Sequence, residues 1–215
     1  MNERKSGKIN ILIADDHPIF RQGLKHAFSE TADLAVVGEA SNGFEALEKI
    51  RSLDINVVLL DISMAGQSSL DTLKQIKVEK PKLPVLVLSV YPEDQCAVRF
   101  IRAGAAGYLT KESISDQLLD AVRKVAIGGR YVSQTLTEKL AFDFADPEKR
   151  PHELLSDREF QVFCMIGGGK SLTQIGKDLS LSVKTVGTHR THILEKMKMK
   201  TNAQLIQYAI LNQLV

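Results

Sequence analysis

Cysteine is scarce in this sequence, and no stretch is long and apolar enough to suggest a membrane anchor. The 215 residues include two cysteines, Cys96 and Cys164, which lie far apart without the spacing of metal ligands. A disulfide framework and a thiolate metal site are therefore excluded, and we expect both side chains to be buried in a reducing compartment. No apolar run approaches the roughly 20 residues that cross a bilayer, and no signal-like block opens the chain. We expect a cytoplasmic protein with no membrane partner.

Net charge is also small, but its distribution is uneven. The formal charge is +2, and hydrophobic residues make up 44% and charged residues 25% of the chain, as in ordinary globular proteins. From His152 onward there are eight lysines and arginines against five acids, whereas the preceding part has 20 against 21. The basic excess of the C-terminal part favours an anionic partner there.

The first part of the chain alternates between apolar strands and amphipathic helices. Strands are predicted at 9–14, 34–38, 56–61, 85–89 and 107–111. Helical spacing of apolar residues predicts a helix after each strand. The first two helices would bury Ile19, Phe20, Leu24, Ala27 and Phe28, and then Phe44, Ala46, Leu47 and Ile50. Because parallel strands need crossover connections, this order predicts a doubly wound α/β fold with a five-stranded parallel sheet.

The strand that ends at Asp61 organises the rest of this part. Its four apolar residues run straight into the carboxylate, which is typical of a strand buried on both faces. In open α/β sheets, sites lie at the carboxyl ends of the strands. Polar residues follow the other strands at the same edge, namely Asp15, Asp16, Ser89 and Lys111.

Three carboxylates at one sheet edge repel one another unless a cation lies among them. Mg²⁺ accepts carboxylate oxygens while it retains several waters, so it is the ion we expect there. With the metal bound, Asp61 can act as a carboxylate nucleophile toward phosphorus and form an acyl phosphate. The Lys111 ammonium and the Ser89 hydroxyl would help to neutralise the transferred group.

Each residue of this set also has a structural explanation when it is taken alone. Asp15 and Asp16 could cap the first helix, Ser89 could end its strand in a turn, and Lys111 could be a solvated surface residue. Their joint occurrence at strand ends favours the functional interpretation. His17 stands beside the acidic pair, but no second ligand type recurs nearby, and we interpret it as structural.

From residue 152 onward the pattern is helical. Ser156-Asp157-Arg158-Glu159 is a capping box before an apolar helix that stops at Gly167. Further helices are predicted at 171–179, 183–197 and 202–214. Two short helices joined by a tight turn, the second of them basic, make a helix-turn-helix, so we predict a small all-α domain of four helices.

A charged segment bounded by prolines separates the two parts. Residues 146–151 read Asp-Pro-Glu-Lys-Arg-Pro, and a glycine pair at 128–129 ends the last helix of the first part. We therefore predict a first domain at 1–130, a tether with some helix of its own at 131–151, and a second domain at 152–215.

Helical spacing divides the predicted helix 183–197 into two faces. Val183, Val186, Ile193, Leu194 and Met197 are expected to face the core. The other face is basic and slim, with Lys184, Thr185, Gly187, Thr188, Arg190 and Thr191. Recognition helices present such an N-terminal half to DNA bases while flanking cations hold phosphates. A solvated basic helix in an interaction bundle is the alternative, which composition favours about as strongly.

Several segments of the first part resemble the receiver domain of bacterial response regulators. They are Asp15-Asp16 and residues 59–64, 88–94 and 104–111, and the resemblance covers about residues 8 to 130. It implies a flavodoxin-like fold in which Asp61 accepts a phosphoryl group from a phosphohistidine on a sensor kinase. By the family pattern, Asp16 and Asp61 bind Mg²⁺ with the Ser63 backbone carbonyl, and Asp15 assists. Ser89 and Tyr108 match the two switch positions, and Lys111 matches the phosphate-binding lysine.

The second part resembles the LuxR-type output domain, so that the whole chain resembles a NarL/FixJ-type response regulator. The segments that carry this are Leu155 to Glu159, Gln174 to Leu179 and Val183 to Met197. The family pattern puts base contacts at Gly187, Thr188 and Thr191, and phosphate contacts at Lys184, Thr185, His189 and Arg190. The last helix would form the dimer, with Leu205, Ala209 and Leu211 as candidates.

The resemblance implies a transcription regulator rather than an enzyme for other substrates. Phosphorylation of Asp61 would draw Ser89 and Tyr108 inward and free or pair the helix-turn-helix units on promoter DNA. The expected partners are a sensor histidine kinase, double-stranded DNA, a second copy of the chain and RNA polymerase.

One position departs from the receiver pattern, and two other functions stay open. Receivers often have Met-Pro-Gly where this chain has Met64-Ala65-Gly66; alanine lacks the fixed φ of proline, so a looser loop could alter the lifetime of the phosphorylated state. The first domain could instead serve only for phosphorylation-independent dimerisation, which the complete acidic set argues against. It could also be a metal-dependent phosphatase, but no further general acid or substrate-pocket motif is present.

Overall fold

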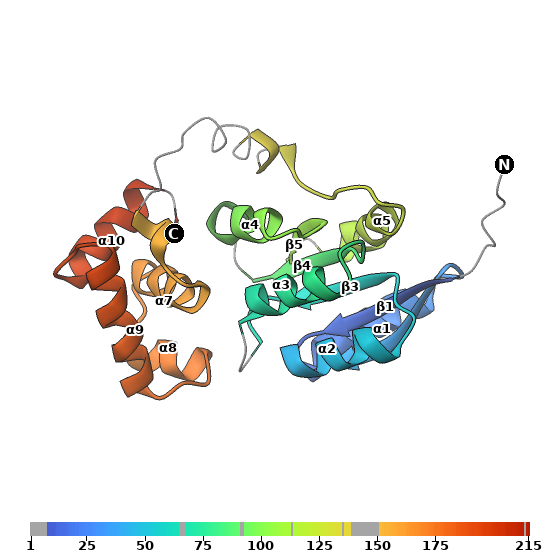
Figure 1. Ribbon diagram of the computed structural model, residues 1–215, viewed down its shortest axis with the longest axis horizontal. Coiled ribbons are helices and arrows are strands. Elements are labelled where there is room, and N and C mark those ends of the chain that lie inside the picture. The colour runs from blue at the N-terminus through green and yellow to red at the C-terminus, as the bar shows by residue number, and fades with distance from the viewer. Residues whose placement is uncertain are drawn as a thin grey trace. The chain divides into compact units, whose positions relative to one another are not determined.

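The computed structural model describes residues 8–64, 68–90, 93–112, 114–134, 136–138, 151–212 and 214–215. The chain forms two compact units, and the main division falls between Ser133 and Gln134 (Figure 1). Ala65, most of the predicted tether and the side chain of Cys96 lie outside the described part, whereas Cys164 is buried as expected. Within the described part, no helix is long and apolar enough to cross a bilayer.

A five-stranded parallel sheet forms the centre of the first unit, which confirms the predicted fold class. Its order is β2-β1-β3-β4-β5. Every residue of β3 and of β4 is buried, as expected for strands covered on both faces. The strands are β1 (Ile9–Ala14), β2 (Leu34–Ala40), β3 (Val57–Asp61), β4 (Val85–Ser89) and β5 (Gly107–Thr110).

Among the described residues, helices α1 to α5 connect and follow these strands and lie on both sides of the sheet (Figure 1). Leu24 and Phe28 of α1 share one core with Leu118 and Val122 of α5 against alternate residues of the central strands. Pro18 occupies the first turn of α1, where its missing N–H costs nothing. The helices are α1 (Pro18–Ser29), α2 (Gly43–Ser52), α3 (Ser69–Glu79), α4 (Glu93–Arg102) and α5 (Ile114–Ala126).

Two apolar residues that were expected in the core are exposed. Ile19 is 88% exposed and Phe44 is 66% exposed. Only Phe20 of the pair Ile19-Phe20 lies on the buried stripe of α1, because neighbouring helical residues point about 100° apart. Phe44 follows the buried Gly43 in the same way. Closely spaced apolar residues predict an amphipathic helix, but they do not determine which of two neighbouring residues is buried.

A segment that was predicted to belong to the tether pairs with the edge strand β5. Tyr131 forms a parallel bridge with Gly107, and its N–H donates to the Ala106 carbonyl at 2.9 Å. A Cβ added to Gly107 would lie 2.5 Å from the Tyr131 carbonyl oxygen, so only glycine allows this approach. The first unit therefore continues past residue 130.

The second unit is a small bundle of helices around one apolar core. Phe163, Ile175, Val186, Ile193 and Leu205 are fully buried in it. Capping boxes begin α7, α8 and α10, and each satisfies two backbone N–H groups at its helix start. The elements are η1 (Pro151–Leu154), α7 (Asp157–Gly167), α8 (Leu172–Asp178), α9 (Val183–Lys196) and α10 (Asn202–Leu211).

The turn between α8 and α9 brings these two helices into the expected helix-turn-helix. Leu181 N–H donates to the Gly176 carbonyl at 2.8 Å, which folds the turn back on α8. Ser182 then caps α9 by accepting from the Thr185 N–H. A Cβ on Gly176 would lie 2.8 Å from the Leu181 carbonyl oxygen.

Replacing Gly176 by alanine is expected to destabilise the second unit by about 1–3 kcal/mol, because the methyl group meets backbone rather than a movable side chain. Urea unfolding followed by circular dichroism measures the change. Gly168→Ala is the control, since a Cβ there meets nothing nearer than 3.5 Å. Equal stability of the two variants would show that the turn yields to the extra methyl group.

Candidate functional site

The carboxyl ends of the strands bring the predicted acidic residues together. Asp61 is the last residue of β3, and Asp15 directly follows Ala14, which is paired with Leu60 in the sheet. Asp15 and Asp61 are fully buried, and the side chain of Asp16 is 26% exposed. Ligand atoms of these three residues and of His17 all lie within 4.8 Å of one another.

Lys111 directly follows β5, and its side chain reaches this acidic cluster. The backbone N–H of Lys111 donates to the Ser89 carbonyl at 2.6 Å, and this bond holds Lys111 beside the end of β4. Its ammonium lies 2.7 Å from Asp15 Oδ2 and 3.2 Å from Asp61 Oδ2, and its side chain is 11% exposed. The ammonium also lies 4.3 Å from the centre of the Phe20 ring.

The environment of Asp61 disfavours its ionised form. Burial, and then the neighbouring Asp15 carboxylate, raises the pKa of Asp61 to about 6, although Lys111 opposes the shift. Both carboxylate oxygens are buried, and neither has a well-formed hydrogen bond from the part of the chain that the structure describes. Such a carboxylate, with two more beside it, suits a hard divalent cation, and the oxygen donors match the preference of Mg²⁺.

The two switch positions, Ser89 and Tyr108, lie in β4 and β5. Ser89 and Tyr108 are both fully buried. The Tyr108 N–H donates to the Tyr131 carbonyl at 3.2 Å. The side chain of Tyr108 is thus as fully enclosed by the protein as that of Ser89.

The face of α9 carries most of the predicted DNA contacts at its surface. Lys184, Thr185, Thr188 and Thr191 are exposed, and Gly187 is half-buried with no atom within 4 Å of an added Cβ. The Thr188 and Thr191 hydroxyls donate to carbonyls one turn earlier and hold the threonine side chains against the helix. The result is a slim face that a nucleic-acid groove can approach closely.

Three residues of α9 differ from the simplest expectation. Val183, expected in the core, is 48% exposed, because it lies at the first position of the helix, one turn before the buried Val186. Arg190 Nε donates to Asn202 Oδ1 at 2.5 Å, so this arginine also ties α9 to α10. Burial and the nearby Arg158 lower the pKa of His189, which favours its neutral form.

The dimerisation candidates on α10 fall on both faces of the helix. Leu205 and Ala209 are fully buried in the core of the second unit, so their assignment to a dimer surface was wrong. Leu211 is 74% exposed and Ile210 is 60% exposed. Apolar spacing on one short helix does not distinguish the face that fills its own core from the face left for a partner.

Comparison with known proteins identifies both units. Residues 11–123 match the response regulator receiver domain, and residues 153–209 match the luxR family of bacterial regulatory proteins. The chain is 35% identical over 209 residues to the response regulator GacA of Pseudomonas viridiflava, covering 96% of this chain and 98% of GacA. This protein is a response regulator. It joins a receiver domain to a LuxR-type DNA-binding domain and acts as a transcription regulator of a two-component system.

Other relatives agree with this membership. The response regulator UvrY of Escherichia coli K12 is 33% identical, with 94% of each chain covered. The response regulator RcsB of Salmonella typhimurium has the same fold, with a TM-score of 0.64 at 24% identity over 94% of this chain and 96% of that one. A LuxR-family response regulator from Aurantimonas sp. gives 0.59 at 26% identity, over 65% of this chain and all of that one.

Two residues at the response regulator's acidic site were not predicted to belong to it: His17 was interpreted as structural, and Phe20 was expected only in the core. His17 Nδ1 lies 2.8 Å from Asp16 Oδ1 and 3.2 Å from Asp15 Oδ1, so the histidine belongs to the cluster rather than merely next to it in sequence. Its adjacency to the aspartates was the available signal. The contact of Phe20 with Lys111 had no sequence signal, because 91 residues separate the two.

Proposed function

We propose that this response regulator is switched by transfer of a phosphoryl group to Asp61 from a phosphohistidine on a sensor kinase. The observation that supports this most strongly is the buried Asp61 carboxylate at the end of β3, which has an ammonium 3.2 Å away and no well-formed hydrogen bond from the described residues. A buried carboxylate beside an ammonium is placed to act as a nucleophile toward an anionic phosphoryl donor.

In the transfer, an Asp61 carboxylate oxygen forms a bond to phosphorus as the bond from phosphorus to the kinase's histidine nitrogen breaks. The electron pair of that bond stays on the imidazole nitrogen, and the product on Asp61 is an acyl phosphate. Lys111 lies within ion-pair distance of Asp15 and Asp61, so its ammonium can follow the added negative charge.

Mg²⁺ is the cofactor that we infer for this site. Asp16, Asp61 and the Ser63 backbone carbonyl would hold it, with Asp15 assisting, because these groups supply hard oxygen ligands. When bound, the ion would offset the charge of the carboxylates and of the incoming phosphoryl oxygens.

Labelling by acetyl phosphate tests this proposal directly. We expect incorporation of one phosphoryl group in the presence of Mg²⁺ and little in EDTA, because the uncompensated carboxylates repel the anionic donor. Phosphate-affinity electrophoresis measures the product. Equal labelling in EDTA would contradict the metal requirement, and no labelling in either condition would favour a receiver that serves only for dimerisation.

We further propose that α9 enters the major groove of promoter DNA. Gly187, Thr188 and Thr191 would face base edges, and Lys184, Thr185, His189 and Arg190 would hold phosphates.

Phosphorylation would pair two copies through the exposed part of α10, with Leu211 at the contact. Such a regulator would work in the cytoplasm, with RNA polymerase as a further partner. We place the receiver at about 1–133, slightly beyond the boundary of 130 predicted from the sequence, because Tyr131 pairs with Gly107; the tether would end at 151 and the output domain would span 152–215.

Replacing Lys184 by alanine is expected to weaken binding to all DNA sequences alike and to reduce the slope of log affinity against log salt by about 1, because one phosphate contact is lost. Fluorescence anisotropy with a specific and a scrambled duplex measures both quantities. Lys74→Ala, an exposed lysine of α3, is the matched control and should leave the slope unchanged. An unaltered slope in Lys184→Ala would contradict the proposed contact.

A further inference from the structure

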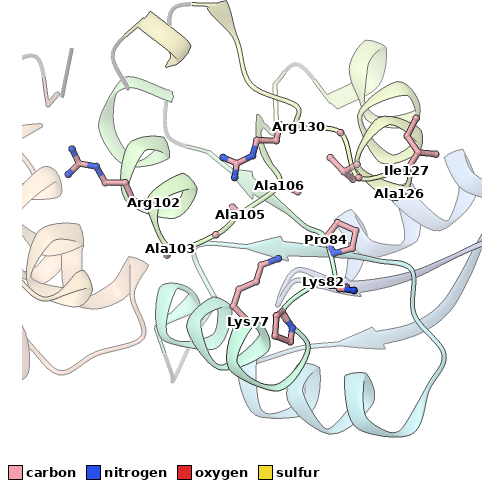
Figure 2. A pocket seen from close by; sticks show the side chains of 15 residues that line it. Lys77, Lys82, Pro84, Arg102, Ala103, Ala105, Ala106, Ala126, Ile127 and Arg130 are labelled. Atoms are coloured by element: carbon pink, nitrogen blue, oxygen red, sulfur yellow. The ribbon is translucent and has the colours of Figure 1, made fainter. Parts of the chain in front are cut away.

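A polar cavity of the receiver unit lies at the end of the sheet opposite to Asp61. It has a volume of about 620 Å³, in the range of small-molecule sites. It lies where α3, α4 and α5 end and where β4 begins, and alanines and glycines of the 103–106 and 126–129 turns form much of its wall (Figure 2). Small side chains at these turns leave the space open.

The charged side chains around this cavity all have the same sign. Lys77, Lys82, Arg102 and Arg130 line it, and none of its 15 lining residues is acidic. Lys77 and Arg130 point into the same space from opposite sides, whereas Arg102 extends away from them (Figure 2). Lys77 and Arg130 carry like charges and face the same space, so an occupant of opposite charge would lower the energy of their arrangement.

Lys77 is held in place before any ligand arrives. Its ammonium donates to the Leu83 carbonyl at 2.6 Å. Its aliphatic stem lies over Gly104, whose φ is +102° and where a Cβ would be 3.3 Å from Lys77 Cγ. Burial, and then the charge of Arg130, lowers the pKa of Lys77.

The simplest structural explanation for such cations is the neutralisation of helix C-termini. The last turns of α4 and α5 already have backbone caps: the Ala105 N–H donates to the Phe100 carbonyl at 3.0 Å, and the Gly129 N–H donates to the Lys124 carbonyl at 3.0 Å. Each helix end carries only about half a negative charge, whereas each side chain carries a full positive one. Capping therefore accounts for part of the positive charge at most.

We propose that this cavity is a binding site for a small anion with two or more phosphate groups, held between Lys77 and Arg130. Two cations that face one space of about 620 Å³ can each hold a separate phosphate group of the same molecule. Lysine acts as a point charge and arginine as a bidentate hydrogen-bond donor, and both bind phosphate oxygens well. Nucleotides and inorganic polyphosphate share this chemistry.

Calorimetric titration of the full chain with inorganic tripolyphosphate, in EDTA and at low ionic strength, tests the proposal. We expect one molecule to bind per chain, and we expect Lys77→Met and Arg130→Gln each to weaken binding about tenfold or more, because each removes a charge-assisted contact. Lys74→Met is the matched control, one turn earlier on α3 and outside the cavity. Lys184→Ala controls for binding to the helix-turn-helix.

The outcomes separate the alternatives. Loss of binding in the two cavity variants alone supports the site, and a melting temperature close to that of the wild type shows that those variants are folded. Equal loss in Lys74→Met, unchanged binding in both cavity variants, loss only in Lys184→Ala, or no binding to the wild type would overturn it. ATP in place of tripolyphosphate distinguishes the sources: tighter binding of ATP identifies a nucleotide site, and equal binding identifies a site for phosphate chains. None of these results depends on labelling of Asp61.

Discussion

Replacing Asp61 by asparagine is expected to abolish phosphoryl transfer to this regulator. Asparagine keeps the shape of the side chain but removes the nucleophilic carboxylate oxygen and one metal ligand. The substitution should not unfold the receiver, because the amide has no charge to bury at a fully buried position. Acetyl phosphate labelling of both proteins measures the loss, and gel filtration of the same samples shows whether a size shift accompanies phosphorylation in the wild type alone.

Asp54→Asn is the matched control for this experiment. Asp54 is an exposed carboxylate just before β3, whereas Asp61 ends the same strand, so the control changes the same group at the far end of the sheet. It should be labelled as fully as the wild type. Persistent labelling of Asp61→Asn would show that another residue accepts the phosphoryl group and would contradict the assignment of Asp61 as the acceptor.

Replacing Gly187 by alanine is expected to change folding and DNA binding in opposite directions. No atom lies within 4 Å of the added methyl group, so the helix should gain about 1 kcal/mol of stability from the better helix former. The same methyl group would project from the slim face of α9 toward the DNA bases. We expect at least a tenfold loss of affinity, about 1.4 kcal/mol, if the backbone at Gly187 contacts the groove.

Gly23→Ala provides the control that separates these two effects. Gly23 lies in the middle of α1, and a Cβ there also meets nothing within 4 Å. It should raise the melting temperature of its own unit and leave DNA affinity unchanged. Thermal unfolding and fluorescence anisotropy on the three proteins give both readouts. If Gly187→Ala binds DNA as tightly as the wild type, the groove does not approach this part of the helix.

The sequence alone determined the order of elements and the chemistry at the strand ends. An apolar run that ends in a carboxylate predicts a doubly covered strand, and parallel pairing places all carboxyl ends at one edge of the sheet. Asp15, Asp61 and Lys111 could therefore be assigned to one place without coordinates. The capping motif at Ser156 was equally local, which is why the start of α7 agrees with expectation.

Tertiary structure alone decided which apolar residues are buried and which distant residues meet. Leu205 and Leu211 have the same character and lie on the same short helix, yet one is fully buried and the other is 74% exposed. Phe20 lies under Lys111, and Lys77 approaches Arg130, although each pair is separated by dozens of residues. Periodicity describes one helix at a time, whereas burial and charge proximity depend on what packs against it, and only the folded chain specifies that partner.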